Sequence, residues 1–358
     1  METILFLALG LVLLVFGANV LVKGAASLAA SFGISPLVIG LTIVAFGTSA
    51  PEMAVSVGAA FAGQADLALG NVVGSNIFNV LLILGLSALV TPLLVNQQLV
   101  RLDVPLMIVA SFLVLLFGLD GNIGRLEGAV LFAGILIYTV FLVFQSRKET
   151  NTAVRAEYEG QYGDKDTDGS IHYLRDGALI LGGLFLLVLG SQWLVDSAIT
   201  IAQYFGVSEL VIGLTIVAAG TSLPEMATSV VASIRGERDI AVGNIVGSNL
   251  FNLLSVLGVS SIVSPSGIVV PVAAISFDIP VMIGVALMCL PIFFSGYVIS
   301  RWNGTLFLFY YVAYTAYLIM AAAQHDAMQE FGMAMSMVIP LTAIALMISA
   351  FRYYRLKS

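Results

Sequence analysis

The sequence predicts an all-α polytopic membrane protein made of two inverted five-helix repeats, followed by an eleventh C-terminal helix. Three observations predict this fold. Of the 358 residues, 59% are hydrophobic and only 10% are charged, whereas soluble domains carry about 25% charged residues. The hydrophobic residues arrive in successive runs of about 20, the length that spans a bilayer. One half of the chain also repeats a long stretch of the other half.

The hydrophobic runs divide into eleven candidate spans, separated by charged residues, prolines and glycines. Membrane β-strands are excluded, because they alternate apolar and polar residues over about ten positions. The first run ends in no small-residue cleavage site, so we expect a retained span rather than a secretion signal. The single cysteine, Cys289, excludes a disulfide framework and a thiolate metal site. The expected spans are 3–31, 36–61, 68–90, 103–118, 126–145, 177–203, 208–234, 240–263, 277–296, 304–322 and 332–351.

The basic residues predict the orientation of these spans. They are few and scattered, without the patch that nucleic acid requires, but they are strongly biased between loops. With the N-terminus outside, the only basic residue of the outer loops is Arg125, which favours N-terminus outside and C-terminus inside. The inner loops and the tail then carry Arg101, Arg147, Lys148, Arg155, Lys165, Arg175, Arg235, Arg238, Arg301, Arg352, Arg355 and Lys357.

The repeat aligns Gly33–Gly85 with Gly206–Gly258 at a shift of 173 residues. Each copy belongs to five spans, an odd number, so the second copy enters the membrane upside down. Inverted repeats are typical of secondary transporters, whose sites lie at the midplane between the halves. We expect a first repeat at 1–145, a polar inner-side linker at 146–176, a second repeat at 177–322, and an extra span with a basic tail at 323–358.

Two acids stand apart from the other carboxylates, because Glu52 and Glu225 lie about halfway along apolar spans. A charge at that depth costs at least a few kcal/mol (about 2.5–3.5 on insertion scales) unless it is compensated. Each follows a proline, Pro51 or Pro224, which removes a helical hydrogen bond and frees a carbonyl. Alternatively, each glutamate could be a packing partner of a basic residue, but Lys23 is the one basic residue embedded in a span. We therefore expect the glutamates to face a cavity.

The residues around the two glutamates are oxygen donors. Carboxylates, hydroxyls, amides and carbonyls, without Cys or His, suit Ca²⁺ or Na⁺ rather than zinc, copper or iron. Two carboxylates neutralise one divalent ion or hold monovalent ions instead, so the two ion types can compete. The candidate ligands are Glu52, Glu225, Thr48, Ser49, Thr221, Ser222, Ser75, Ser248, Asn79, Asn252 and the carbonyls of Ala45 and Ala218.

At these residues the sequence resembles a known family. Gly47-Thr-Ser-Ala-Pro-Glu52 and Gly220-Thr-Ser-Leu-Pro-Glu225, each followed by a Gly-Ser-Asn-x-x-Asn element, are similar to the two repeats of the cation/Ca²⁺ antiporter superfamily, most of all its prokaryotic sodium/calcium exchanger branch. The resemblance implies a ten-helix antiporter core in a prokaryotic inner (plasma) membrane. It also implies alternating access through sliding first and sixth spans, with Ca²⁺ and Na⁺ as substrates. No cofactor, enzyme activity or obligatory protein partner is implied, and membrane lipid is the expected surrounding.

One pair of residues departs from some relatives, and it bears on the coupling ion. Potassium-dependent exchangers carry Asp at the position of Asn252, and some members carry it at Asn79. With Asn at both positions, the cavity holds two formal negative charges instead of three. This favours K⁺-independent exchange.

Other functions explain fewer of these residues. A H⁺-coupled Ca²⁺ or divalent-cation exchanger is the close alternative, since a desolvated carboxylate can take up a proton in place of Na⁺. An intramembrane aspartic-type protease needs two carboxyls that share a proton, which the hydroxyl-rich surroundings do not favour. Two duplicated half-sites in inverted repeats favour alternating access over a passive cation channel, although the sequence does not exclude a leak. Lys23 and Asp196, at equivalent positions of the two halves, are candidates for a gating pair, but snorkelling to the membrane interface explains Lys23 without it.

The linker carries a weaker motif. Asp164, Asp166, Asp168 and Gly169 match the opening of an EF-hand calcium loop. The twelfth position, where a bidentate glutamate is needed, is Arg175. We interpret the stretch as an acidic solvated loop.

We therefore predict that replacing Asp164, Asp166 and Asp168 together with Asn leaves Ca²⁺ transport nearly unchanged, because a solvated loop holds no regulatory ion. Transport rates across a series of Ca²⁺ concentrations measure this. Loss of an activation by Ca²⁺ in the triple variant would instead identify a regulatory site.

Overall fold

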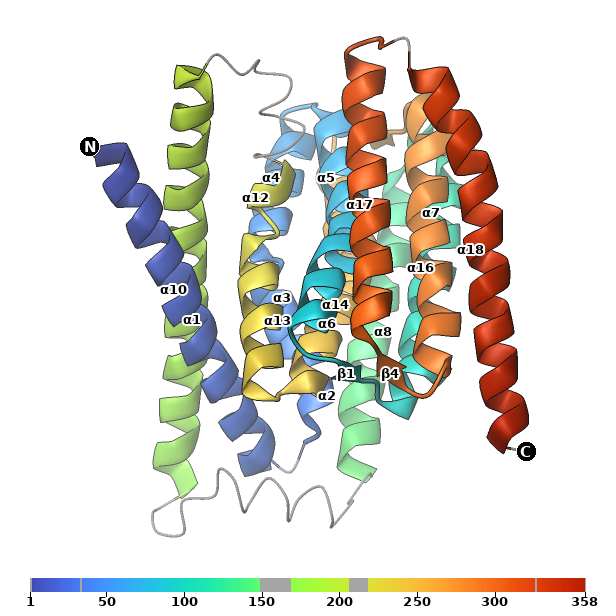
Figure 1. Ribbon diagram of the computed structural model, residues 1–358. Helices are drawn as coiled ribbons and strands as arrows, with labels where there is room; N and C mark the ends of the chain where they lie inside the picture. Colours follow the sequence, from blue (N-terminus) through green and yellow to red (C-terminus); the bar gives the residue numbers. More distant parts are fainter. Residues whose placement is uncertain (1, 33, 149–168, 206–217, 326, 358) are drawn as a thin grey trace.

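The computed structural model describes residues 2–32, 34–148, 169–205, 218–325 and 327–357. Nearly all of these residues are helical, and the long helices run side by side in one bundle (Figure 1). In the described part of the chain, nine helices are long and apolar enough to cross a membrane, and a bent pair makes a tenth. The acidic motif of the linker and residues 206–217 of the seventh expected span lie outside the described residues.

The first repeat has the five spans that the sequence predicts. The second and third spans, and the start of the fourth, contain π-helical turns, labelled η. The elements are α1 (Glu2–Phe32); α2 (Pro36–Ile39), η1 (Gly40–Val44), α3 (Ala45–Thr48) and α4 (Ala50–Phe61); α5 (Ala65–Phe78), η2 (Asn79–Leu84) and α6 (Gly85–Val90); η3 (Leu99–Asp103) and α7 (Val104–Gly118); and α8 (Arg125–Lys148).

The second repeat follows the same order where it is described, and the eleventh span is one further long helix. The elements are α10 (Gly169–Tyr204); α12 (Ala218–Gly220) and α13 (Leu223–Arg235); α14 (Arg238–Phe251), η5 (Asn252–Val256) and α15 (Leu257–Val263); η6 (Ala274–Asp278) and α16 (Ile279–Phe294); α17 (Arg301–Ala322); and α18 (Met328–Lys357).

The second span is broken where the sequence places a proline. Ser49, with φ −81° and ψ 8°, separates α3 from α4, and the two parts of the span bend by 47°. Pro51 lies in the first turn of α4, where its missing N–H leaves no helical bond unmade. Ser222 and Pro224 repeat the arrangement before α13, with φ −90° and ψ 6° at the serine. The duplicated prolines thus produce two duplicated breaks.

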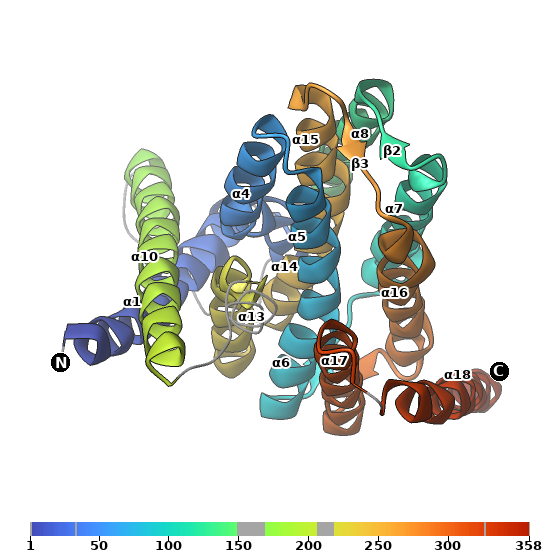
Figure 2. The ribbon, with the colours of Figure 1, turned by 90° about the horizontal axis from the view of Figure 1, so that it is seen from above.

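The long helices α1 and α10 pack against each other at one side of the bundle, while α18 lies at the opposite side (Figures 1 and 2). Their contact is a seam of glycines. A Cβ atom at Gly190 would lie 2.8 Å from the carbonyl oxygen of Gly10, and one at Gly183 would lie 2.8 Å from that of Gly17. The missing side chains let the two backbones touch.

The antiparallel seam also corrects one expectation. Gly24, next to Lys23, lies against Asp176, whereas Gly10 lies against Gly190 and Leu194. Lys23 is therefore near the start of α10, and Asp196 is near its other end. Both side chains are exposed. The gating-pair hypothesis is wrong for this structure, because the two charges lie at opposite ends of the helix pair.

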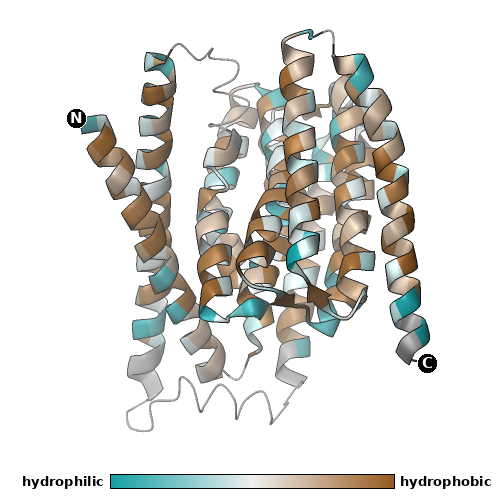
Figure 3. Cartoon of the chain, viewed as in Figure 1, coloured by the Kyte–Doolittle hydropathy of each residue, from teal (hydrophilic) through white to brown (hydrophobic). Residues whose placement is uncertain are grey.

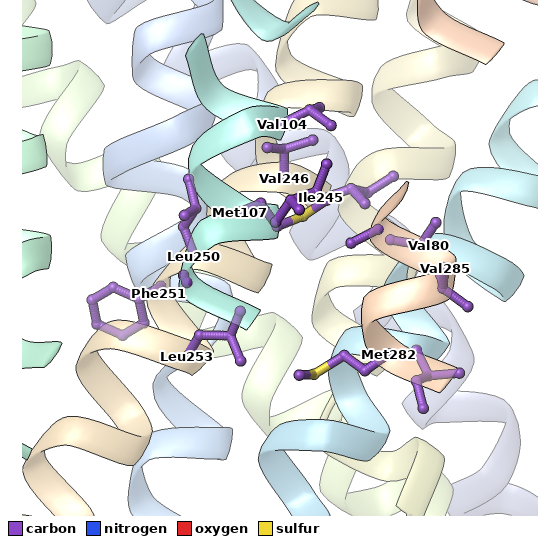
Figure 4. Packing of buried hydrophobic residues seen from close by; sticks show 14 of the residues in the cluster. Val80, Val104, Met107, Ile245, Val246, Leu250, Phe251, Leu253, Met282 and Val285 are labelled. Carbon is purple, nitrogen blue, oxygen red and sulfur yellow. The ribbon is translucent and has the colours of Figure 1, made fainter. Parts of the chain in front are cut away.

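The remaining helices enclose the main hydrophobic core, which is centred on α5, α7, α14 and α16 with their π-helical turns. Figure 4 shows part of it, with Met107 of α7 and Met282 of α16 among residues of α14. The helix α14 and its continuation through α15 are the most enclosed of the candidate spans, because 89% of the apolar window is buried. The centre of the bundle therefore lies where the two repeats meet.

Two short antiparallel ladders, which the sequence does not predict, join loops of opposite repeats. The strand β1 (Leu93–Leu94) pairs with β4 (Val298–Ile299), and β2 (Asn122–Ile123) pairs with β3 (Ile268–Val269). Gly267 precedes β3 with φ +78°, and a Cβ there would lie 2.7 Å from Asn122 Oδ1. Glycine is thus required both for the conformation and for the close approach.

The outer helices present hydrophobic side chains away from the core. Figure 3 shows such residues along the length of α1 and α18. In the apolar windows of these two helices, 28% and 0% of the residues are buried. Because exposed apolar surface of this extent is stable only in lipid, the chain is an integral membrane protein. The eleventh helix packs on α16 and α17, and Tyr310 Oη donates to Thr342 Oγ1 at 2.6 Å.

The glycine seam gives a prediction with its own control. Gly183→Ala should lower the melting temperature of the purified protein, because its Cβ would lie 2.6 Å from the Leu21 backbone nitrogen and overpacking costs about 1–3 kcal/mol. Gly182→Ala, next to it, meets nothing within 4 Å and should leave the melting temperature unchanged or raise it. Equal effects of both substitutions in a thermal-shift assay would contradict a close-packed seam.

Candidate cation site

The two glutamates lie directly after the two helix breaks. Glu52 is in the first turn of α4 and Glu225 is in the first turn of α13, and both are completely buried. The prolines thus start a new helix at the depth of each carboxylate. Because α4 and α13 belong to opposite repeats, the breaks bring two acidic side chains to the centre of the bundle from two sides.

Serines of one repeat hold the carboxylate of the other repeat. Ser49 Oγ donates to Glu225 Oε1 at 2.8 Å, and Ser222 Oγ donates to Glu52 Oε1 at 2.8 Å. Ser248 Oγ adds a longer contact of 3.4 Å to Glu225 Oε1. Each serine spends its hydrogen on a carboxylate, so its oxygen lone pairs stay available to a cation. The two half-sites are therefore interlocked.

The hydroxyls of the two predicted threonines donate to two asparagines that are not among the predicted ligands. Thr48 Oγ1 lies 3.1 Å from Asn244 Oδ1, and Thr221 Oγ1 lies 3.2 Å from Asn71 Oδ1. Each asparagine amide in turn donates to the backbone carbonyl of its own repeat's glutamate, at 3.3 Å for Glu52 and 3.4 Å for Glu225. These asparagines thus tie the threonines to the helices that carry the carboxylates.

The sequence repeat contains the information that identifies Asn71 and Asn244 as equivalent polar residues. They occupy the second position of the duplicated Gly-Asn-x-Val-Gly-Ser-Asn stretch, 173 residues apart. Their amides also donate to Ser56 Oγ and Ser229 Oγ, both at 2.9 Å. Comparing every polar residue of the two copies, rather than those near the glutamates, would have found them.

Asn79 and Asn252 begin the π-helical turns η2 and η5 and are completely buried. Asn79 Nδ2 donates to Asn249 Oδ1 at 3.0 Å, and Asn252 Nδ2 donates to Asn76 Oδ1 at 3.2 Å. Such π-helical turns are frequent at functional sites. The amide hydrogens are thus turned toward other asparagines, and the side-chain oxygens are turned away from them.

Five buried oxygen atoms of the predicted ligand set have no hydrogen-bond donor among the described residues. An unmatched buried oxygen costs about 1–3 kcal/mol, and a cation compensates it as a donor would. All five are lone-pair donors of the kind that Ca²⁺ and Na⁺ bind. They are Glu52 Oε2, Glu225 Oε2, Asn79 Oδ1, Asn252 Oδ1 and Ser75 Oγ.

Of the two predicted carbonyl ligands, that of Ala45 is not freed as expected, and that of Ala218 stays a prediction. Pro51 does not free the carbonyl of Ala45, because that oxygen accepts the N–H of Ser49 at 3.0 Å and a contact from Thr48 Oγ1 at 3.4 Å. Pro51 lies in the first turn of α4, where a missing N–H leaves no helical bond unmade, so it frees no carbonyl of the preceding turn. Ala218 begins the short helix α12, directly after residues 206–217, which lie outside the described part of the chain.

The donor set is hard and carries little charge. The described residues hold no group of three or more His, Cys, Asp and Glu side chains arranged for a metal. The contacts of both carboxylates in that same part of the chain are hydroxyls. Two carboxylates with neutral oxygens fit one divalent ion or a few monovalent ions, and they do not fit a transition metal.

The chain matches known proteins over most of its length. The sequence profile described as "Sodium/calcium exchanger protein" matches residues 2–147 and 177–320. The "Putative antiporter CaxA" of Alkalimonas amylolytica is 43% identical over 80% of this chain and 88% of that protein. The "Inner membrane protein YrbG" of Escherichia coli (strain K12) is 41% identical over 73% and 80%.

A solved structure is similar throughout the described fold. The sodium-calcium exchanger NCX_Mj, soaked with 2.5 mM Na⁺ and 0.1 mM Ca²⁺, superimposes with a TM-score of 0.75. The identity is 29%, and the match covers 88% of this chain and 98% of that one.

Proposed function

The chain belongs to the sodium/calcium exchanger family, in the prokaryotic branch of the cation/Ca²⁺ antiporter superfamily, and on this premise we propose that it exchanges Na⁺ for Ca²⁺ across a prokaryotic inner membrane. The observation that carries the proposal is the pair of completely buried glutamates, whose Oε2 atoms, like the side-chain oxygens of Asn79 and Asn252, have no hydrogen-bond donor among the described residues. The family consists of transporters, and the proposed substrates are the ions themselves.

Competition between the ions follows from charge. With both glutamates ionised, one Ca²⁺ brings the cavity to neutrality, so a divalent ion gains attraction from two carboxylates at once. Na⁺ ions can occupy the same oxygens with one charge each. In a poorly hydrated site such differences are large. The two substrates therefore bind alternately, and this alternation couples their transport.

Alternating access is proposed for α1 and α10. Leu184 of α10 packs against Gly47, and Val195 of α10 packs against Gly220. These glycines begin the two motifs that end in Glu52 and Glu225. Because α10 covers both breaks and is joined to α1 by the glycine seam, sliding of the pair would expose the site to one side at a time. The repeat limits of 1–145 and 177–322 and the N-outside orientation belong to the same proposal.

The proposed site predicts that Glu52→Gln or Glu225→Gln abolishes Ca²⁺ exchange in a folded protein, because a divalent ion would lose half of its charge compensation in a low-dielectric site. Uptake of ⁴⁵Ca²⁺ by Na⁺-loaded proteoliposomes measures this. Glu330→Gln makes the same change at an exposed residue of α18 and should leave uptake normal. Near-normal uptake with either site variant would contradict the proposed site.

The uncharged side chains of Asn79 and Asn252 predict how Na⁺ and Ca²⁺ transport are coupled. If three Na⁺ exchange for one Ca²⁺, one net charge moves per cycle, and it is worth about 2.3 kcal/mol per 100 mV. Transport should therefore be driven by Na⁺ and respond to a clamped membrane potential, without needing K⁺. Asn252→Asp adds a negative charge and should strengthen monovalent binding. An absolute K⁺ requirement, or uptake that follows a pH gradient and ignores Na⁺, would reject Na⁺ coupling and favour the H⁺-coupled alternative.

A further inference from the structure

Four asparagines form a closed group where the two repeats meet. They are Asn76 and Asn79 of the first repeat, and Asn249 and Asn252 of the second, and each is at most 3% exposed. Asn76 Nδ2 and Asn249 Nδ2 each donate to the other's backbone carbonyl, both at 3.3 Å. Their side-chain oxygens accept from the amides of Asn252 and Asn79. Every side-chain hydrogen bond in this group crosses from one repeat to the other.

The backbone determines which way each amide faces. A backbone carbonyl accepts hydrogen bonds and never donates them, so the carbonyl of Asn76 must meet the NH₂ group of Asn249. The oxygen of Asn249 is then the atom that faces Asn79. Asn79 must in turn present its own NH₂ group to that oxygen, which leaves Asn79 Oδ1 directed elsewhere. In the same way, the carbonyl of Asn249 and the side chain of Asn76 determine the direction of Asn252 Oδ1.

Two arguments exclude the reverse orientation of the Asn79 amide. If the amide of Asn79 were rotated by half a turn, its oxygen would face the oxygen of Asn249, and two acceptors would repel each other. The NH₂ group would then replace the oxygen that has no donor in the described residues, and its partial positive charge would oppose a cation. An asparagine at this position is a ligand only when its partner selects the oxygen.

Methionine sulfurs close the outer side of the group. Met107 Sδ lies 3.5 Å from Asn249 Nδ2, and Met282 Sδ lies 3.8 Å from Asn76 Nδ2. These methionines project into the hydrophobic core (Figure 4). A thioether is a weak acceptor that offers no strong alternative to the carbonyl bonds. The amides of Asn76 and Asn249 therefore have one good partner each.

We propose that Asn76 and Asn249 are positioning residues that hold the side-chain oxygens of Asn252 and Asn79 toward the transported cation. The proposal rests on the proposed function, because it requires an ion at the site. Asn249 of the second repeat acts through Asn79 of the first, and Asn76 acts through Asn252. Each half-site is thus completed by an orientation that the opposite repeat imposes.

The test is the affinity of the purified full-length protein for ⁴⁵Ca²⁺ at equilibrium. Asn249→Leu keeps the shape of the side chain and removes both polar atoms. Mutation of a residue that orients a metal ligand typically lowers the metal affinity by about 10- to 100-fold, so Ca²⁺ binding should weaken by that factor. Asn249→Ser, which is shorter but keeps a polar group, should weaken binding in the same direction if Asn249→Leu does not fold.

A second set of variants separates positioning from a general structural role. In an Asn79→Ala background, Asn249→Leu or Asn249→Ser should cause no further loss of affinity, because the oxygen that Asn249 orients is gone. Asn76→Leu in that background should weaken binding again, because it acts through Asn252. A merely structural role would make all these losses add. Melting temperatures show which variants are folded well enough to compare.

The outcomes also separate this proposal from the proposed function. Wild-type protein that binds neither Ca²⁺ nor Na⁺ would reject the function, and the positioning role would fall with it. Wild-type protein that binds Ca²⁺, with Asn249 variants of unchanged affinity or with losses that add to that of Asn79→Ala, would reject the positioning role alone. We expect the single variants to bind Ca²⁺ more weakly. In the Asn79→Ala background, we expect the Asn249 substitutions to have no further effect.

Discussion

Two buried carboxylates, which have no basic partner among the described residues, constrain the rest of this structure. An ionised carboxylate is costly inside a bilayer, and Glu52 and Glu225 are both completely buried. Serine hydroxyls donate to one oxygen of each carboxylate, while the second oxygen of each stays without a donor in the described chain. The prolines, the helix breaks and the π-helical turns are features that place oxygen atoms around these two charges. A cation completes the compensation, and we infer that it is the transported ion.

The inverted duplication is therefore more than a way to make ten spans. Ser49 and Ser222 each reach the glutamate of the other repeat, and the four central asparagines bond only across the same boundary. Neither half alone contains a finished set of ligands. The two strand pairs join loops of the opposite repeats in the same way, so the halves are linked at the site and at both ends of the bundle.

The sequence predicts the spans and the ligand-bearing residues because both depend on the cost of polarity in lipid. The limits of the long helices follow from this cost, the breaks before Pro51 and Pro224 follow from the prolines, and the burial of Glu52 and Glu225 follows from their place within apolar spans. The partners of these residues do not, because pairing across the repeats depends on the packing of helices that are far apart in sequence. A polar residue such as Asn249 looks like an ordinary helix-packing residue until its partner is known. The strands are two residues long, too short for any periodicity, and the Ala45 carbonyl keeps a bond that the rule for proline does not address.

The most direct measurement is anomalous diffraction from crystals of this protein grown with Ca²⁺ or with Sr²⁺ as its heavier substitute. The account predicts one strong peak within coordination distance of Glu52 Oε2 and Glu225 Oε2, about 2.3–2.6 Å for Ca²⁺, with side-chain oxygens of Asn79 or Asn252 among the ligands. A peak that contacts neither glutamate, or ordered crystals at saturating Ca²⁺ in which the two carboxylates bond only to protein groups, would contradict it.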